Sequence, residues 1–260
     1  MSETRREQLA TVHRALSALE LVATRGRLNV TQIAGQMNIG KASAHRLAVT
    51  LTEHGWLIKN EDFSYGLGPS VAGLFASAQT GTDIRASMRP LLEQLRATTG
   101  ETIHLTKLVG RHIVYLDQLV STRPVHSVSQ VGSRSPAHCV SPGISQLAVS
   151  APEQVEWFLS APLARFTPDT ITDPFEFREL LAKVKAVGYS TNLGGYRPDV
   201  GGVGIAIRNS SGSPVAGLSV CAPVYRLRSL DKESIGSMLV KAATVATGIL
   251  ESGNVTVVAE

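Results

Sequence analysis

The two cysteines of the chain, Cys139 and Cys221, are the side chains best suited to covalent chemistry. Cys139 directly follows His138, and a thiol beside an imidazole suggests a nucleophile with its general base. However, adjacent residues of an extended segment point to opposite sides, which leaves His138 poorly placed to deprotonate its own neighbour. We therefore expect Cys139 to be a small apolar residue in the lining of a pocket. The alternative is an enzyme that uses Cys139 and carries an N-terminal protein-interaction module.

The histidines and glycines do not predict a metal or cofactor site. The seven histidines and two cysteines contain no paired ligand spacing such as C-x-x-C or H-x-x-x-H. The glycines at 194–195 and 201–204 lack the spacing of a dinucleotide fingerprint, and no strand-to-helix transition follows them. We expect a loop and a closely packed strand there, with no metal, no cofactor and no catalytic residue.

The composition is that of a folded chain that works in the cytoplasm. Of the 260 residues, 43% are hydrophobic and 18% are charged, which excludes a disordered chain. No apolar run reaches the roughly 18 residues that span a bilayer. The N-terminal sequence MSETRREQLA lacks the apolar stretch of a secretory signal. We therefore expect a cytoplasmic protein that makes no membrane contact.

Positive charge is concentrated in the first 60 residues. This segment holds eight Lys and Arg against four Asp and Glu, whereas the other 200 residues hold 17 of each sign. An asymmetry of this kind indicates an anionic partner such as nucleic acid, although a solvated basic face is the common alternative.

The periodicity of the N-terminal segment predicts the elements that would position this charge. Apolar residues recur at three- and four-residue steps over three stretches, and strand-like alternation follows. Asn29 and Gln32 form a capping-box pattern at the start of the second helix. The predicted elements are helices at 8–25, 30–37 and 41–54 and strands at 56–59 and 63–67. This order places the third helix in the major groove of DNA, as in a helix–turn–helix with a wing.

The candidate DNA contacts are basic or small polar side chains that fall outside the predicted apolar faces. Those on the third helix can approach base edges, and those on the hairpin can reach the neighbouring backbone or the minor groove. A three-helix packing unit for protein contacts and a non-sensing architectural DNA binder are the alternatives. The candidates are Thr31, Gln32, Lys41, Ser43, His45, Arg46, Thr50, Lys59 and Tyr65.

The rest of the chain mixes helices with neighbouring strands, which predicts an α+β sheet layer. The predicted helices are a linker at 70–79 and further helices at 83–99, 144–150, 153–160, 175–187 and 231–250. The predicted strands are 102–109, 111–120, 125–131, 203–208 and 214–221, with an irregular segment at 134–143.

Several of these segments resemble the IclR family of bacterial transcriptional regulators. The resemblance rests on residues 29–34, 41–47 and 65–68 in the first part, and on 136–143, 201–206 and 214–220 in the second. It covers about residues 8–250, and the pieces occur in the family's order. It implies a winged helix–turn–helix domain at 1–68, a linker helix at 69–82 and a GAF-like α/β domain at 83–260. It also implies a double-stranded DNA operator, a small organic acid effector and a homodimer, often a dimer of dimers.

The resemblance also locates the effector pocket. The implied residues are Cys139, Val140, Ser141, Pro142, Gly143, Asn192, Gly202, Ser219 and Cys221. No Lys or Arg occurs from Ala137 to Ala164, so backbone amides at a helix start near Gly143 would bind the carboxylate unless Arg134 or Arg197 folds in. The small residues in this set favour an effector larger than glyoxylate or pyruvate, such as an aromatic carboxylate.

Overall fold

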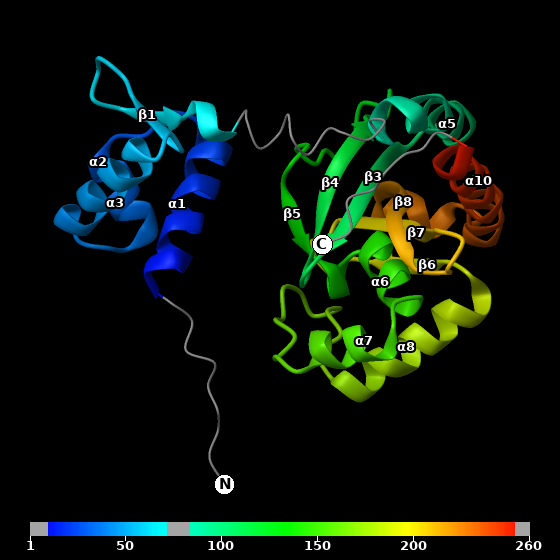
Figure 1. The fold of residues 1–260 in the computed structure, drawn as a ribbon. Coiled ribbons are helices and arrows are strands. Elements are labelled where there is room, and N and C mark those ends of the chain that lie inside the picture. The colour runs from blue at the N-terminus through cyan, green and yellow to red at the C-terminus, as the bar shows by residue number, and fades with distance from the viewer. Residues whose placement is uncertain (1–9, 72–83, 253–260) are drawn as a thin grey trace, which may run out of the picture. The chain divides into compact units, whose positions relative to one another are not determined.

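The computed structural model describes residues 10–71 and 84–252, drawn in colour in Figure 1. The chain divides into two compact units, residues 1–80 and 81–260. Of the predicted linker helix, residues 69–71 are helical, and the remainder lies outside the described residues. Among the described helices, none is long and apolar enough to cross a membrane.

The N-terminal unit has the predicted order of three helices and a hairpin. Its elements are α1 (Ala10–Arg25), α2 (Val30–Met37), α3 (Lys41–Glu53), β1 (Leu57–Lys59) and β2 (Tyr65–Leu67). The capping box at the start of α2 is confirmed, since the side chain of Asn29 accepts from the Gln32 amide and the Gln32 side chain accepts from the Asn29 amide, both at 2.9 Å. Asn38 then ends α2 in a left-handed conformation, which creates the sharp turn into α3.

Only part of the apolar stripe predicted on α1 is buried. Ala18 and Val22 belong to the core of this unit, but Val12 and Leu16 are 52% and 58% exposed. The second half of α1 therefore makes most of its contact with the core.

The C-terminal unit is built on a six-stranded antiparallel sheet with the order β5-β4-β3-β8-β7-β6. Its strands are β3 (Thr102–Val109), β4 (His112–Leu119), β5 (Arg134–Pro136), β6 (Ser190–Leu193), β7 (Val200–Arg208) and β8 (Pro214–Pro223). Its helices are α5 (Ile84–Thr99), α6 (Ser141–Ala148), α7 (Pro152–Leu159), α8 (Pro174–Val187), α9 (Val224–Ser229) and α10 (Lys232–Ser252), with a 3-10 turn at Ala137–Cys139.

The two faces of this sheet carry different side chains. One face presents branched apolar residues such as Ile103, Leu218 and Val220. The helices α5 and α10 pack against this face (Figure 1). On the other face the same strands present small or polar residues, including His104 and Ser219, and α6 packs there. Side chains alternate along a strand, so one strand sequence supplies both a dense core and a face where a cavity can form.

The prediction of a strand at 125–131 is wrong, because this segment forms an irregular loop. Its backbone is held by side chains: the carbonyl of Ser127 accepts from the Thr102 hydroxyl, and the amide of Ser129 donates to the Gln118 side chain. The edge of β4 pairs with β5 instead.

Two neighbouring predictions also differ from the structure. The segment 134–143, expected to be irregular, holds β5, the 3-10 turn and the first turn of α6. Residue Asn192, for which no strand was predicted, lies on the short strand β6.

Candidate functional sites: a DNA-binding surface and a buried pocket

The exposed face of α3 carries the predicted recognition residues. Lys41, His45, Arg46 and Thr50 are exposed, whereas Ala44 and Ala48 on the opposite side are buried. Ser43 is half-buried and lies 3.3 Å from a guanidinium nitrogen of Arg46. The first turn of this helix therefore presents basic groups beside short side chains, which permits close approach to a DNA groove.

The other polar candidates in this unit lie on its surface. Thr31 and Gln32 are exposed at the start of α2, and the carbonyl oxygen of the Gln32 side chain is already used in the capping box. Lys59 is exposed on the hairpin, with its ammonium 5.0 Å from the centre of the Phe63 ring. Phe63, which the sequence reading missed, is 70% exposed at the tip of this wing.

Tyr65 cannot make the DNA contact that was predicted for it. It is only 2% exposed and belongs to the core of the N-terminal unit, while its backbone pairs with that of Leu28. Within β2, Tyr65 is buried, Gly66 is half-buried and Leu67 is 41% exposed. The pattern of the hairpin thus makes Tyr65 a structural residue.

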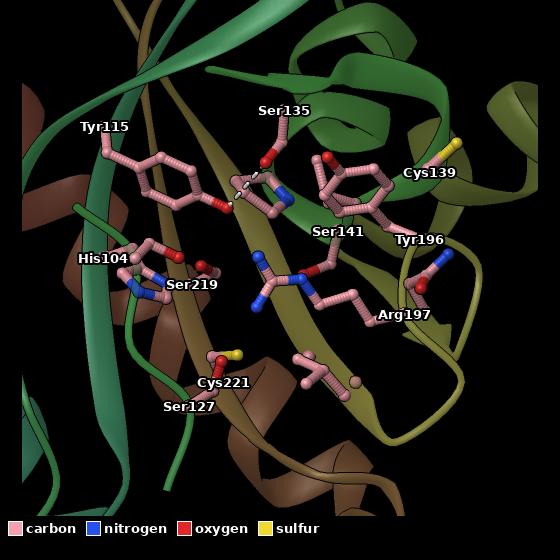
Figure 2. A pocket seen from close by; sticks show the side chains of 17 residues that line it. His104, Tyr115, Ser127, Ser135, Cys139, Ser141, Tyr196, Arg197, Ser219 and Cys221 are labelled. Atoms are coloured by element: carbon pink, nitrogen blue, oxygen red, sulfur yellow. Dashed lines mark hydrogen bonds between the residues drawn. The ribbon is translucent and has the colours of Figure 1, made fainter. Parts of the chain in front are cut away.

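In the C-terminal unit, a pocket lies between the polar face of the sheet and the loop before α6 (Figure 2). The empty space in the pocket and at its mouth, open solvent included, is about 540 Å³. Its lining residues are His104, Tyr115, Ser127, Ser129, Ser135, Cys139, Val140, Ser141, Pro142, Asn192, Tyr196, Arg197, Val200, Gly201, Gly202, Ser219 and Cys221.

The structure brings together eight of the nine residues that the family resemblance implied for the effector site. Gly143 is the exception, because it does not line the pocket. A side chain at Gly143 would overlap the backbone of Ala137, so this glycine allows the first turn of α6 to pack on the preceding 3-10 turn. Its role is a close backbone approach rather than a ligand contact.

The amide groups proposed to bind the carboxylate are largely used within α6. The helix begins at Ser141 rather than near Gly143, and the amides of Gly143 and Ile144 both donate to the carbonyl of Val140. Pro142 has no N–H to offer. The sequence offered Arg134 or Arg197 as the alternative to these amides, and Arg197 lines the pocket.

Arg197 is a positively charged residue in the lining of the pocket. Its side chain extends into the pocket between Ser219 of β8 and Ser141 at the start of α6 (Figure 2). Burial raises the pKa of the Tyr115 hydroxyl, whereas the positive charge of Arg197 lowers the pKa of the same hydroxyl. Arg197 is itself exposed, which places a cation at the open side of the site.

Three aromatic rings missed by the sequence reading complete the lining: His104, Tyr115 and Tyr196. The rings of His104 and Tyr115 meet edge to face with their centres 4.9 Å apart. The Tyr115 hydroxyl lies 3.3 Å from that of Ser135. These residues come from β3, β4 and the segment after β6, so no single local pattern indicates all three.

The geometry does not support a reactive thiol. Burial raises the pKa of Cys139 to about 12 and that of Cys221 to about 11, so both thiols are protonated at neutral pH. The Nε2 atom of His138 lies 2.9 Å from the carbonyl oxygen of Ala164, which engages the imidazole away from the thiol. In the ranges that the structure describes, no group of three or more His, Cys, Asp or Glu could hold a metal ion.

The two units match two parts of one known family. Residues 11–61 match the IclR helix-turn-helix domain, and residues 76–246 match the bacterial transcriptional regulator IclR C-terminal domain. The chain is 28% identical over 232 residues to the HTH-type transcriptional regulator BhcR of Paracoccus denitrificans, covering 88% of this chain and 83% of that protein.

Two further relatives are similar over most of the chain. The p-hydroxybenzoate hydroxylase transcriptional activator of Acinetobacter baylyi is 29% identical over 229 residues, which is 85% of this chain and 84% of that protein. The crystal structure of an IclR homologue from Microbacterium hydrocarbonoxydans, complexed with 4-hydroxybenzoate, aligns with a TM-score of 0.75 at 27% identity. That alignment covers 94% of this chain and 99% of the homologue.

Because the two family models match residues 11–61 and 76–246, the chain belongs to the IclR family of DNA-binding bacterial transcriptional regulators.

Proposed function

We propose that this regulator is controlled by a small organic acid, an aromatic carboxylate, that binds in the C-terminal pocket and alters the affinity of the N-terminal unit for its operator. The observation that carries this proposal is the side chain of Arg197, which reaches into a cavity lined by aromatic rings and small residues. A guanidinium binds a carboxylate with two parallel hydrogen bonds. It is therefore the expected anchor for the acidic end of such a ligand.

The remaining lining suits the body of the ligand. The rings of Tyr115 and Tyr196 offer flat apolar surfaces against which an aromatic ring can pack. Gly202 lets β7 approach Ser141 closely, because a Cβ atom there would lie 2.8 Å from the Ser141 hydroxyl oxygen. The 4-hydroxybenzoate complex of the Microbacterium homologue supports a ligand of this size and charge.

The proposal includes the setting in which the regulator works. It acts in the cytoplasm on double-stranded DNA as a homodimer, or as a dimer of dimers, and it has no enzyme activity. The raised pKa values of Cys139 and Cys221 support this last part, because neither thiol is a thiolate at neutral pH.

The proposal is tested by titrating the full-length protein with benzoate and 4-hydroxybenzoate in a calorimeter and in an operator mobility-shift assay. We expect at least one acid to bind and to change the amount of shifted DNA. Arg197→Gln should weaken acid binding by roughly 10- to 100-fold, as expected for the loss of a hydrogen bond to a charged group. It should leave DNA binding without ligand unchanged.

Arg228→Gln is the matched control, since it removes one positive charge from an exposed residue of α9 that does not line the pocket. Equal acid affinities for wild type and Arg197→Gln would show that Arg197 does not bind the carboxylate. An operator shift that no acid changes would favour the architectural DNA binder. Consumption of the acid would favour the enzyme alternative.

A further inference from the structure

His104 and Ser219 form a polar pair on the sheet side of the pocket. They stand opposite each other on the paired strands β3 and β8, and both line the cavity. Side chains of directly paired residues lie on the same face of a sheet, and Figure 2 shows the two side by side. They are only 3% and 2% exposed, so the pair lies deep in the site, whereas Arg197 is exposed.

The pair has unused hydrogen-bonding capacity. The Nε2 atom of His104 is buried without a hydrogen-bond partner, and the Ser219 hydroxyl makes no hydrogen bond to any residue that the structure describes. Other hydroxyl groups near the same face are bonded: Ser145 donates to the carbonyl of Gly204, and Ser190 donates to that of Ser141. Most buried polar atoms in proteins have a partner, so the free capacity of this pair indicates a partner on a ligand.

The pair is uncharged, which decides what kind of group it can bind. Burial lowers the pKa of His104 to about 4, so its imidazole is neutral at neutral pH. A neutral imidazole offers one donor and one acceptor, and a serine hydroxyl offers both as well. A hydroxyl group can donate to one of these residues and accept from the other. A carboxylate only accepts, and its charge is better satisfied by Arg197 at the open side.

We infer that His104 and Ser219 bind a hydroxyl substituent of the effector, so that the regulator selects hydroxylated aromatic carboxylates over the unsubstituted acid. The inference rests on the proposed function, in which the acidic end of the ligand is held by Arg197. The two residues act as specificity determinants: they contribute to the binding of the hydroxylated acid and little to that of benzoate.

The test is calorimetric titration of the full-length protein with benzoate and with 2-, 3- and 4-hydroxybenzoate. We expect one hydroxylated isomer to bind wild type at least 10-fold more tightly than benzoate. His104→Leu and Ser219→Ala should each reduce this preference to less than about 3-fold. Their affinity for benzoate should stay within about 3-fold of wild type.

Thr106→Val is the matched control. Thr106 lies two residues beyond His104 on β3, and its buried hydroxyl is already bonded to the carbonyl of Gly217 and does not line the pocket. This variant should keep the wild-type preference. If His104→Leu does not fold, as judged by its melting curve, Ser219→Ala alone decides.

The outcomes separate the two proposals. Binding of the acids without preference in wild type, or a preference that survives in both variants, overturns the role of the pair and leaves the carboxylate site standing. Failure of folded wild type to bind any of the four acids overturns the aromatic-carboxylate proposal, and this inference with it.

Discussion

Arg46 shows how a single side chain can be assigned from its place on an element. It is exposed on the first turns of α3, on the side opposite the buried alanines. An arginine in this position contacts either a base edge or a phosphate. Which of the two it contacts changes the expected effect of removing it.

We predict that Arg46→Ala weakens operator binding by about 1–3 kcal/mol if the side chain reads a guanine, with relaxed specificity at that base. If Arg46 holds a phosphate, the mutation should weaken binding to all sequences and lower the salt slope by about one unit. Mobility-shift titrations at several salt concentrations measure both. The Arg228→Ala variant serves as the control, and unchanged binding by folded Arg46→Ala would remove this residue from the interface.

The two thiols are a second prediction at the residue scale. Both are buried, with pKa values of about 12 for Cys139 and about 11 for Cys221. A raised pKa leaves the thiol protonated and inert over the neutral range, and reactivity should rise only as the pH approaches these values. At pH 8 we therefore expect a thiol-specific reagent to label native protein much more slowly than unfolded protein. Rapid labelling of native Cys139 would revive the nucleophile hypothesis.

At the scale of elements, the close contact between α6 and the sheet depends on a glycine, which has no side chain. A Cβ atom at Gly204 would lie 2.6 Å from the backbone nitrogen of Pro142, so α6 could not stay where it is. Hydrogen bonds hold the helix in this position, including one from the Ser145 hydroxyl to the carbonyl of Gly204. The position of α6 in turn sets the positions of Ser141 and Pro142, which line the pocket.

Gly204→Ala should therefore lower the free energy of unfolding by about 1–3 kcal/mol, the usual cost of overpacking a core. It should also weaken acid binding, because Ser141 and Pro142 line the pocket. Chemical denaturation and calorimetry measure the two effects. Gly248→Ala is the control in the same unit, since a Cβ there meets no atom within 4 Å. Equal stabilities of the two variants would show that α6 shifts at no cost.

At the scale of the whole molecule, one recognition helix per chain has a consequence for the operator. If two copies bind DNA with two-fold symmetry, their recognition helices read two half-sites that form an approximate palindrome. DNase footprinting should show half-sites separated by about one helical turn or a multiple of it. A single short asymmetric footprint would contradict the proposed homodimer on DNA.

Local sequence signals were sufficient for the N-terminal unit. The helices, the capping box at Asn29 and the turn before α3 each depend on contacts within a few residues, so periodicity and capping residues predicted them. The same applies to the hairpin of β3 and β4 around Gly110 and to α8, which ends at Gly188. The order of short motifs was enough to indicate the IclR family.

The lining of the pocket was decided only by the tertiary structure. His104, Tyr115 and Arg197 come from three segments spread over more than 90 residues of the chain. A register shift between β3 and β4 leaves Leu116 unpaired. Tyr115 lines the pocket and Asp117 bonds Arg89 of α5, although strict alternation would place them on one face. Such features depend on strand register and on close approach between distant segments, which no local pattern encodes. The sequence therefore located residues 139–142 of the lining and offered Arg197 only as one of two alternatives, and it did not indicate the rings.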